Sequence, residues 1–225
     1  MSGRGLGAAL LLPLCLMAGA RSGCSQETGS ARWRMAGGWI AVGPNAPFET
    51  RLGTRRHQVY LIGLRARRPL LRGGAVELYH TIDIVPLAVS GATPVRYEQA
   101  SCDSTGPVPL ERTGVASVCG QPVQRRATVY GAGLVPAGLE LRYAPHRGVR
   151  VVVGATIGAL YFTRPLPDPN AARLNFAVAG DFGVRVGTGG DRAIDVRYRF
   201  QHISNGGTAF NPGMNAHMLQ VGLGM

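Results

Sequence analysis

Residues 194–204 of the chain, IDVRYRFQHIS, decide its fold. Apolar and polar residues alternate along this stretch, and the apolar row consists of Ile194, Val196, Tyr198 and Phe200. Side chains two residues apart in a β-strand lie on the same face, so His202 and Ser204 continue the apolar row. In a water-soluble protein, polar side chains are expected on the face that meets water. A His-x-Ser pair in the apolar row therefore favours a membrane barrel, whose outer face meets lipid and whose interior is polar.

The same alternation recurs along most of the chain. We predict eight strands, at residues 35–43, 55–65, 75–86, 127–142, 149–162, 174–187, 192–204 and 214–225. The connections after the second, fourth and sixth strands are short, and those after the first, third, fifth and seventh are mostly longer. Outer-membrane barrels have short periplasmic turns and longer external loops. The chain is therefore predicted to be all-β, an eight-stranded antiparallel transmembrane β-barrel over residues 35–225, with both ends in the periplasm and His202 and Ser204 near the external end.

An eight-stranded β-sandwich is the alternative architecture. It explains the alternation equally well, but it gives no reason for His202 and Ser204 to extend a buried row. Within the barrel, Pro136 and Gly138 indicate a bulge or a break in the fourth strand. Aromatic belts are expected where the barrel meets the two membrane surfaces, formed by Trp33, Trp39, Tyr161 and Phe162.

The N-terminus has the features of an export signal. Residues 1–20 combine a positive charge at Arg4, an apolar core at 6–17 and the small residues Ala-Gly-Ala at 18–20, which together predict a signal peptide. The apolar core is too short to cross a bilayer as a helix. Residues 21–34 are predicted to be a disordered segment, and lipidation of Cys24 is an alternative that the charge of the nearby Arg21 disfavours. We expect export to the outer membrane.

The chain is strongly basic, with a formal charge of +12, and all 24 of its basic residues are arginine. Nucleic-acid binding is the usual interpretation of such a charge. Export, and arginines that are scattered rather than clustered with aromatic residues, argue against a nucleic-acid partner. Two interpretations stay open: a coding bias, or guanidinium groups that bind phosphates and carboxylates of lipopolysaccharide.

Two of the four cysteines, Cys102 and Cys119, lie in the longest predicted connection. In an exported protein they are candidates for a disulfide, which would stabilise the fold by about 3 kcal/mol. Two free thiols are the alternative.

The second half of the chain carries a longer pattern around the His-x-Ser pair. The segment 198–207, YRFQHISNGG, is followed by NPGMNAHML at 211–219 and preceded by LYFTRPLPDPNAARLNFAVAGDFGVRV at 160–186. Over roughly residues 127–225, this pattern resembles the lipid A 3-O-deacylase family of outer-membrane barrels, also called the acyloxyacyl hydrolase family. The resemblance implies a lipid-facing serine esterase that removes a 3-hydroxyacyl chain from lipid A.

By this resemblance, Ser204 is the nucleophile and His202 its general base. Their spacing along a strand places both side chains on one side, as this pairing requires. Asn205 and Gly207 are the oxyanion-hole residues that the resemblance implies, and a glycine-rich turn can bring backbone N–H groups to a developing oxyanion. A simple hairpin turn at 205–207 is compatible with that role.

The expected acidic member of the triad is missing, since Asn215 stands where family members carry an acidic residue. An amide can orient the His202 ring, but it cannot offset the charge of an imidazolium. In one serine protease, the corresponding acid-to-amide change lowered the rate by about 10⁴. His217 lies on the same face and is a poorer third member. A slow or inactive enzyme is therefore an open alternative.

The expected partners are lipid A or lipopolysaccharide in the outer leaflet and the membrane itself, and a homodimer is left open. No metal or cofactor is expected, because the five histidines, His57, His80, His146, His202 and His217, lack a tight ligand spacing. A non-catalytic barrel with a structural or adhesion role is the second hypothesis, and a soluble basic binding protein the third.

Overall fold

The computed structural model describes residues 32–50, 53–99, 102–103, 106–107, 122–146, 148–211 and 213–224. Residues 1–31, which include the predicted signal peptide and nearly all of the predicted disordered segment, lie outside this description. Within the described ranges, no helix is long and apolar enough to cross a membrane.

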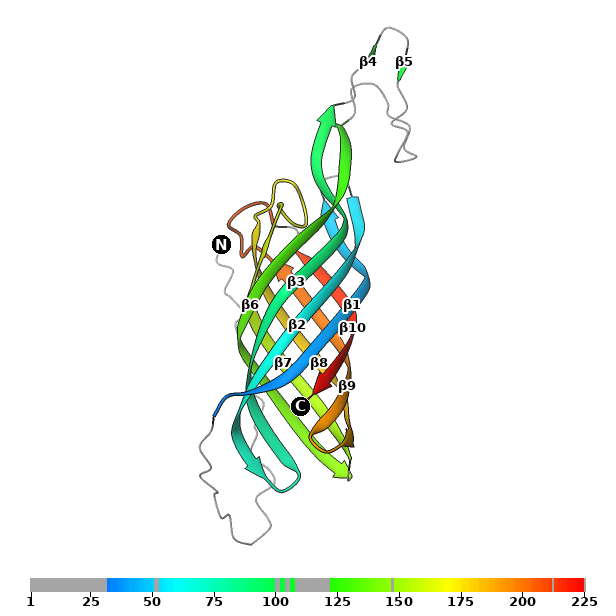
Figure 1. Cartoon of the computed structure of the whole chain (residues 1–225). Helices are drawn as coiled ribbons and strands as arrows, with labels where there is room; N and C mark the ends of the chain where they lie inside the picture. The colour runs from blue at the N-terminus through cyan, green and yellow to red at the C-terminus, as the bar shows by residue number, and fades with distance from the viewer. Residues whose placement is uncertain are drawn as a thin grey trace, which may run out of the picture.

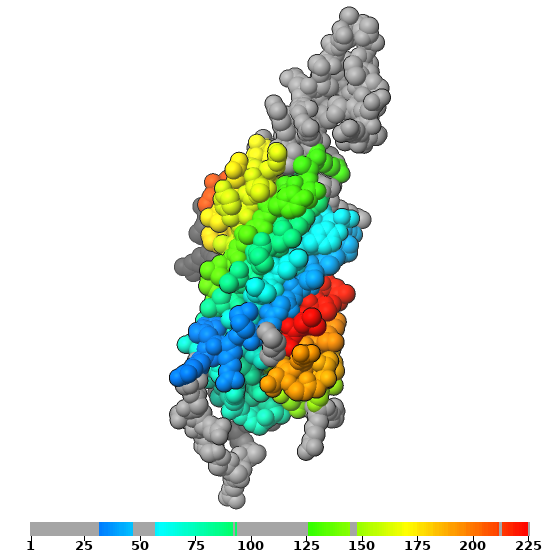
Figure 2. All heavy atoms as spheres, in the orientation of Figure 1, coloured from blue at the N-terminus to red at the C-terminus, as the bar shows by residue number. Residues whose placement is uncertain are grey.

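Eight long antiparallel strands close into a barrel in the order β1-β10-β9-β8-β7-β6-β3-β2 (Figure 1). Their bounds are β1 Arg34–Thr50, β2 Gly53–Gly73, β3 Val76–Gln99, β6 Pro122–His146, β7 Val149–Phe162, β8 Leu174–Gly189, β9 Arg192–Ser204 and β10 Met214–Gly224. Two short strands, β4 (Cys102–Asp103) and β5 (Gly106–Pro107), pair with each other between β3 and β6. Figure 2 shows β1, in blue, beside β10, in red, where the barrel closes. Closure confirms the barrel and excludes the β-sandwich.

All eight predicted strands are present, and the first four extend well beyond the predicted ends. β3 continues to Gln99 and β6 begins at Pro122, so the two form a long hairpin at one end of the barrel (Figure 1). Their pairing continues through register shifts where glycine and proline interrupt the alternation. A register shift between Leu134 and Ala137 confirms the bulge predicted at Pro136 and Gly138.

The connections have the expected lengths with one exception. Short turns link β2 to β3, β6 to β7 and β8 to β9 at one end, and longer connections over residues 100–121, 163–173 and 205–213 lie at the other. Only residues 51–52 separate β1 from β2, so the prediction of a longer first connection is wrong. The two strands are paired up to Thr50 and Gly53, which leaves no room for a loop. By the rule for outer-membrane barrels, the end with the longer connections is the external one.

The outer wall is apolar along its whole height. On β8 and β9, exposed and buried residues alternate, and the exposed row of β9 is the apolar row of the sequence. Large side chains such as Phe182 and Leu223 are 59% and 68% exposed. A continuous apolar outer surface of this kind is stable in hydrocarbon and not in water. The chain is therefore a transmembrane β-barrel.

The interior contains an ion network in its periplasmic half. Five buried arginines pair with four buried carboxylates; the members are Arg65, Arg142, Arg185, Arg197, Arg199, Asp83, Glu140, Asp181 and Asp195. Glu140 is central, because it accepts hydrogen bonds from Arg65 at 2.9 Å, from Arg197 at 2.8 Å and from Arg142. These five arginines form ion pairs inside the barrel. This is a third role for arginine, beside the two interpretations drawn from the sequence, coding bias and lipopolysaccharide binding.

The external half of the interior is mainly apolar, although it also contains the buried polar side chains of His57, Ser90 and Thr93. Its buried side chains include Leu61, Leu160, Phe162, Ile203, Met214 and Met218. Trp39 and Phe162 are 5% and 2% exposed and lie inside the barrel, so the prediction that they form a membrane belt is wrong. Neighbouring residues in a strand point to opposite faces, so only one of Tyr161 and Phe162 can face lipid. Tyr161 does so, and Trp33 is also exposed.

Candidate active site

The external end of β9 places His202 and Ser204 on the outer wall. Both side chains are half-buried, and Ile203 between them is fully buried in the interior. In the sheet, His202 lies opposite Val178 of β8 and Asn215 of β10, and Ser204 lies opposite Phe176 of β8. The two side chains therefore stand in the row that faces lipid, as the alternation predicts.

His202 is held by a residue on the neighbouring strand. Its Nδ1 lies 2.7 Å from Oδ1 of Asn215. An amide oxygen only accepts hydrogen bonds, so Nδ1 carries the proton and donates a hydrogen bond to the Asn215 oxygen. The other ring nitrogen, Nε2, then keeps its lone pair, which is the tautomer that a general base needs.

Ser204 and His202 share a face, but the structure contains no hydrogen bond between Ser204 Oγ and the imidazole ring among the described residues. Residues two apart in a strand have Cα atoms about 6.5 Å apart, so the two side chains must lean toward each other to make contact. Catalytic hydrogen bonds are often long before substrate binds and tighten in the complex.

A glycine packs against the imidazole. At Gly213 a Cβ atom would lie 3.2 Å from Cε1 of His202, and its φ of +62° favours glycine. Gly213 therefore lets the backbone approach the ring closely, next to the strand that holds Asn215. The sequence reasoning did not single it out, although the Asn-Pro-Gly run at 211–213 is a turn signal that could have done so.

Asn205 organises the loop that follows Ser204. Its side chain is buried, at 1% exposure; Oδ1 accepts a hydrogen bond from the Gly207 N–H at 3.0 Å, and Nδ2 donates to the Phe210 carbonyl at 3.1 Å. The Asn205 backbone N–H donates to Oδ1 of Asn211 at 3.1 Å. Both predicted oxyanion N–H groups, those of Asn205 and Gly207, are therefore engaged within the loop.

Between them, Gly206 has a φ of +65°. Its N–H makes no hydrogen bond to any residue in the described part of the chain. A Cβ atom at this position would lie 2.9 Å from the Phe176 ring, so only glycine fits without a shift. Gly206, two residues after Ser204, is thus a third candidate backbone donor. The sequence pointed to Asn205 and Gly207 as oxyanion residues but not to the glycine between them.

His217 contacts Tyr198 and not His202. Its Nδ1 makes a short hydrogen bond with the Tyr198 hydroxyl, and its ring packs edge-on against Phe200, with the centroids 5.3 Å apart. It lies opposite Phe200 in the sheet, two residues from the Asn215–His202 pair. Asn215 is therefore the residue that the structure brings to His202.

The predicted disulfide cannot be placed. Cys119 lies outside the described residues, and of Cys102 only the backbone, in β4, is described. The pairing stays a prediction.

A second Ser–His pair lies inside the barrel. Ser90 Oγ is 2.9 Å from Nδ1 of His57, and Thr93 Oγ1 lies within hydrogen-bond distance of both. All three side chains are buried among the interior residues of β2 and β3. The two Ser–His pairs thus differ in the face of the wall that they occupy.

Comparison with known proteins finds a similarity over the second half of the chain. Residues 118–224 match the family described as lipid A 3-O-deacylase (PagL), which confirms the resemblance drawn from the sequence. No curated protein matches the chain. Among solved structures, the chain is similar to the outer membrane enzyme PagL, with 15% sequence identity and a TM-score of 0.49 over 82% of this chain and 97% of that one. It is also similar to Neisserial surface protein A (NspA), with 12% identity and a TM-score of 0.46 over 86% of this chain and 98% of that one.

Proposed function

Because residues 118–224 match the lipid A 3-O-deacylase family, we propose that this chain is an outer-membrane serine esterase that removes a 3-hydroxyacyl chain from lipid A. Ser204 is the nucleophile, His202 the general base and Asn215 the residue that orients His202. The observation that carries the proposal is the hydrogen bond between His202 and Asn215 on the lipid-facing wall, two residues from a serine in the same row.

The position of Ser204 suits an acyl substrate. It lies at the external end of the barrel, where the outer leaflet meets the wall, and Phe176 and Val178 beside it are 50% and 42% exposed. An acyl chain of lipid A can lie along these apolar side chains while its ester group reaches Ser204. A substrate in the membrane thus meets the site from the side, without entering the barrel.

The reaction is an acyl transfer in two steps. Nε2 of His202 accepts the Ser204 proton while Oγ attacks the ester carbonyl carbon. The tetrahedral oxyanion collapses, the bond to the sugar oxygen breaks, and His202 returns the proton to that oxygen. Water, activated by His202, then attacks the acyl-serine, which releases the 3-hydroxy fatty acid and restores Ser204.

Backbone N–H groups of the loop after Ser204 stabilise the oxyanion. The Gly206 N–H is available for this role, whereas Asn205 and Gly207 become donors only if they give up their bonds to Asn211 and to the Asn205 side chain. Asn215 holds the reactive tautomer of His202 but adds no negative charge beside the imidazolium. A working but slow enzyme follows from this combination.

The two Ser–His pairs provide a matched test. The refolded chain is incubated with lipid A in detergent micelles, and products are followed by mass spectrometry. We expect the wild type and Ser90→Ala to release one 3-hydroxy fatty acid, and Ser204→Ala to lose at least about 10³ in rate. Heat-modifiable gel migration checks that each variant is folded. Equal release by Ser204→Ala would contradict the assigned nucleophile, and no release by any protein would favour a non-catalytic barrel.

We also propose that residues 1–20 are removed on export to the outer membrane and that Cys102 and Cys119 form a disulfide. The mass of the chain isolated from outer membranes tests the first point, since an acyl group on Cys24 would add to it. Thiol labelling before and after reduction tests the second. Labelling of Cys102 without reduction would contradict it.

A further inference from the structure

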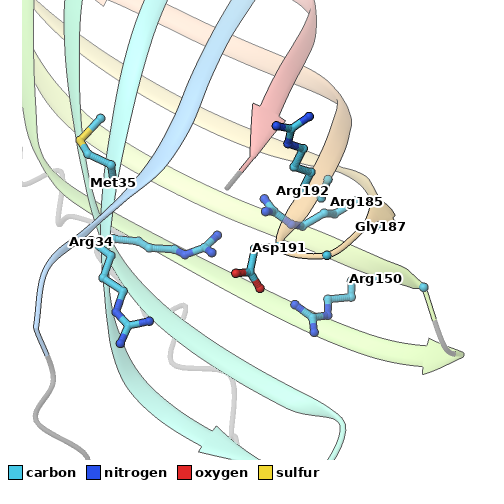
Figure 3. A pocket seen from close by; sticks show the side chains of 11 residues that line it. Arg34, Met35, Arg150, Arg185, Gly187, Asp191 and Arg192 are labelled. Carbon is cyan, nitrogen blue, oxygen red and sulfur yellow. The ribbon is translucent and has the colours of Figure 1, made fainter.

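The periplasmic mouth of the barrel holds a cavity of about 450 Å³ (Figure 3). It lies between the β1–β2 side of the wall and the β7–β8–β9 side. His202 and Ser204 are at the other end of the barrel. Five arginines line it: Arg34, Arg67, Arg150, Arg185 and Arg192. Figure 3 shows the Arg150 and Arg185 side chains extending into the cavity on the side where Asp191 lies. Asp191 is the one acidic lining residue in the described part of the chain.

Positive charge exceeds negative charge in this cavity. Five arginines and one aspartate give a lining charge of 5 − 1 = +4. Carboxylates outside the lining also reach Arg185 and Arg150: Asp195 binds Arg185 at 2.8 Å, and Glu77 lies 3.6 Å from the partly exposed Arg150. Counting both, and leaving out Arg67 because it has a partner of its own, gives 4 − 3 = +1. Deeper in the barrel, Arg65, Arg142 and Arg197 converge on Glu140, and each of them forms an ion pair with at least one buried carboxylate.

The cavity has free space among these charges. Gly148, Gly187 and Gly190 line it without side chains, and a Cβ atom added at Gly148 or Gly190 would meet nothing within 4 Å. The Gly187 N–H donates to the Gly148 carbonyl at 2.8 Å, which ties the β6–β7 turn to the end of β8. The arginines therefore surround an open space, and a backbone hydrogen bond holds together the two strand ends beside it.

Like-charged guanidinium groups around one cavity repel each other, and an anion between them removes that cost. Guanidinium forks match the oxygens of phosphate, with which they form paired hydrogen bonds. A phosphate monoester offers three terminal oxygens and can pair with more than one guanidinium at once, so it suits several arginines around one opening better than one carboxylate does. The volume lies within the usual range for small-molecule sites and exceeds what a lone phosphate needs.

We propose that the arginine-lined mouth is a binding site for a phosphate-bearing molecule with a small polar body, such as a glycerol phosphate. Two sources share this chemistry: a free phosphate ester in the periplasm, and the headgroup of an anionic phospholipid in the inner leaflet beside the mouth. The site is separate from the hydrolytic one, and neither requires the other.

Binding of glycerol 3-phosphate to the refolded full chain, in a zwitterionic detergent, tests the free ester by titration calorimetry. Co-sedimentation with phosphatidylcholine vesicles, with and without phosphatidylglycerol, tests the headgroup. The test variant is Arg34→Gln/Arg150→Gln. Its control, Arg164→Gln/Arg173→Gln, removes the same charge from exposed arginines at the external end.

We expect the test variant to weaken binding at least tenfold and the control to leave it unchanged, with lipid A deacylation the same in both. Saturable binding of the free ester identifies a soluble ligand, whereas binding to phosphatidylglycerol vesicles alone identifies the headgroup. The proposal is overturned if neither probe binds, or if both variants weaken binding equally, since that result reports net charge only. Normal binding by the test variant also overturns the proposal, whatever its deacylation rate.

Discussion

The two halves of the barrel share one kind of outer wall but have opposite interiors. Toward the external end, the interior is filled by apolar side chains such as Leu160, Ile203 and Met218. Toward the periplasmic end, it is filled by the ion network around Glu140. The two regions meet where Arg199 lies over the Trp39 ring, 5.2 Å from its centroid.

This difference bears on where lipid chemistry can occur. Because side chains fill the interior at the external end, a substrate in the membrane can contact the barrel there through its outer wall. His202 and Ser204 are on that wall. The ionic filling at the other end places arginines where the mouth opens to the periplasm. One alternating strand pattern thus supports two kinds of site, one on each face of the wall.

The largest effect is expected from breaking the ionic half. Glu140→Ala leaves Arg65, Arg142 and Arg197 buried with less compensating charge, which destabilises the barrel by about 3–5 kcal/mol. Urea unfolding in phospholipid vesicles measures the loss. Glu77→Ala is the matched control, because its pair with Arg150 is 3.6 Å long and partly exposed and contributes about 0–1 kcal/mol. Equal losses in the two variants would remove the special role of the buried network.

The apolar half should respond to a cavity. Leu160→Ala removes a fully buried side chain and costs about 2–5 kcal/mol by the same unfolding measurement. Leu134→Ala, on the outer wall, leaves space that lipid fills, because lipid tails are as apolar as leucine, and it costs about 1 kcal/mol or less. A larger loss for Leu134→Ala than for Leu160→Ala would mean that the external interior is not tightly packed.

On the outer wall, we expect the charge of the side chain at position 215 to set the rate of the proposed reaction. Asn215→Asp adds a carboxylate beside His202 Nδ1 and stabilises the imidazolium, so single-turnover release of hydroxy fatty acid should rise about tenfold or more. Asn215→Leu removes the acceptor and should lower the rate, with little change in KM. Faster release by Asn215→Leu, or slower release by Asn215→Asp in a folded barrel, would argue against an orienting role for this residue.

Much of the outer wall was predictable, because strict alternation assigns each residue of β9 to a face. The same rule, applied to Tyr161 and Phe162, would have sent one of them inward. The external extensions of β3 and β6 were not predictable, since backbone hydrogen bonds continue where Gly91 and Pro94 end the apolar pattern.

The site was predictable only where it lies on strands. Sharing a face made Asn215 a candidate partner of His202, and the sheet register brings the two together. The conformation of the loop after Ser204 could not be predicted, because the hydrogen bonds of Asn205 require Phe210 and Asn211, five and six residues later, to fold back onto it. The charge surplus at the mouth was hidden too, since its arginines come from β1 and β2 on one side and from β7, β8 and β9 on the other, and these two sides face each other only in the closed barrel.

The smallest effect is expected from the second outward histidine. His217→Phe removes the hydrogen bond with Tyr198 but keeps an aromatic ring against Phe200, so stability should fall by about 0.5–1.5 kcal/mol and the release rate should stay within about twofold. Tyr198→Phe is its partner control and should behave alike. Loss of hydrolysis in His217→Phe, with Tyr198→Phe still active, would move the third triad role from Asn215 to His217. Unchanged hydrolysis in both keeps the chemistry at the external end of β9 and β10.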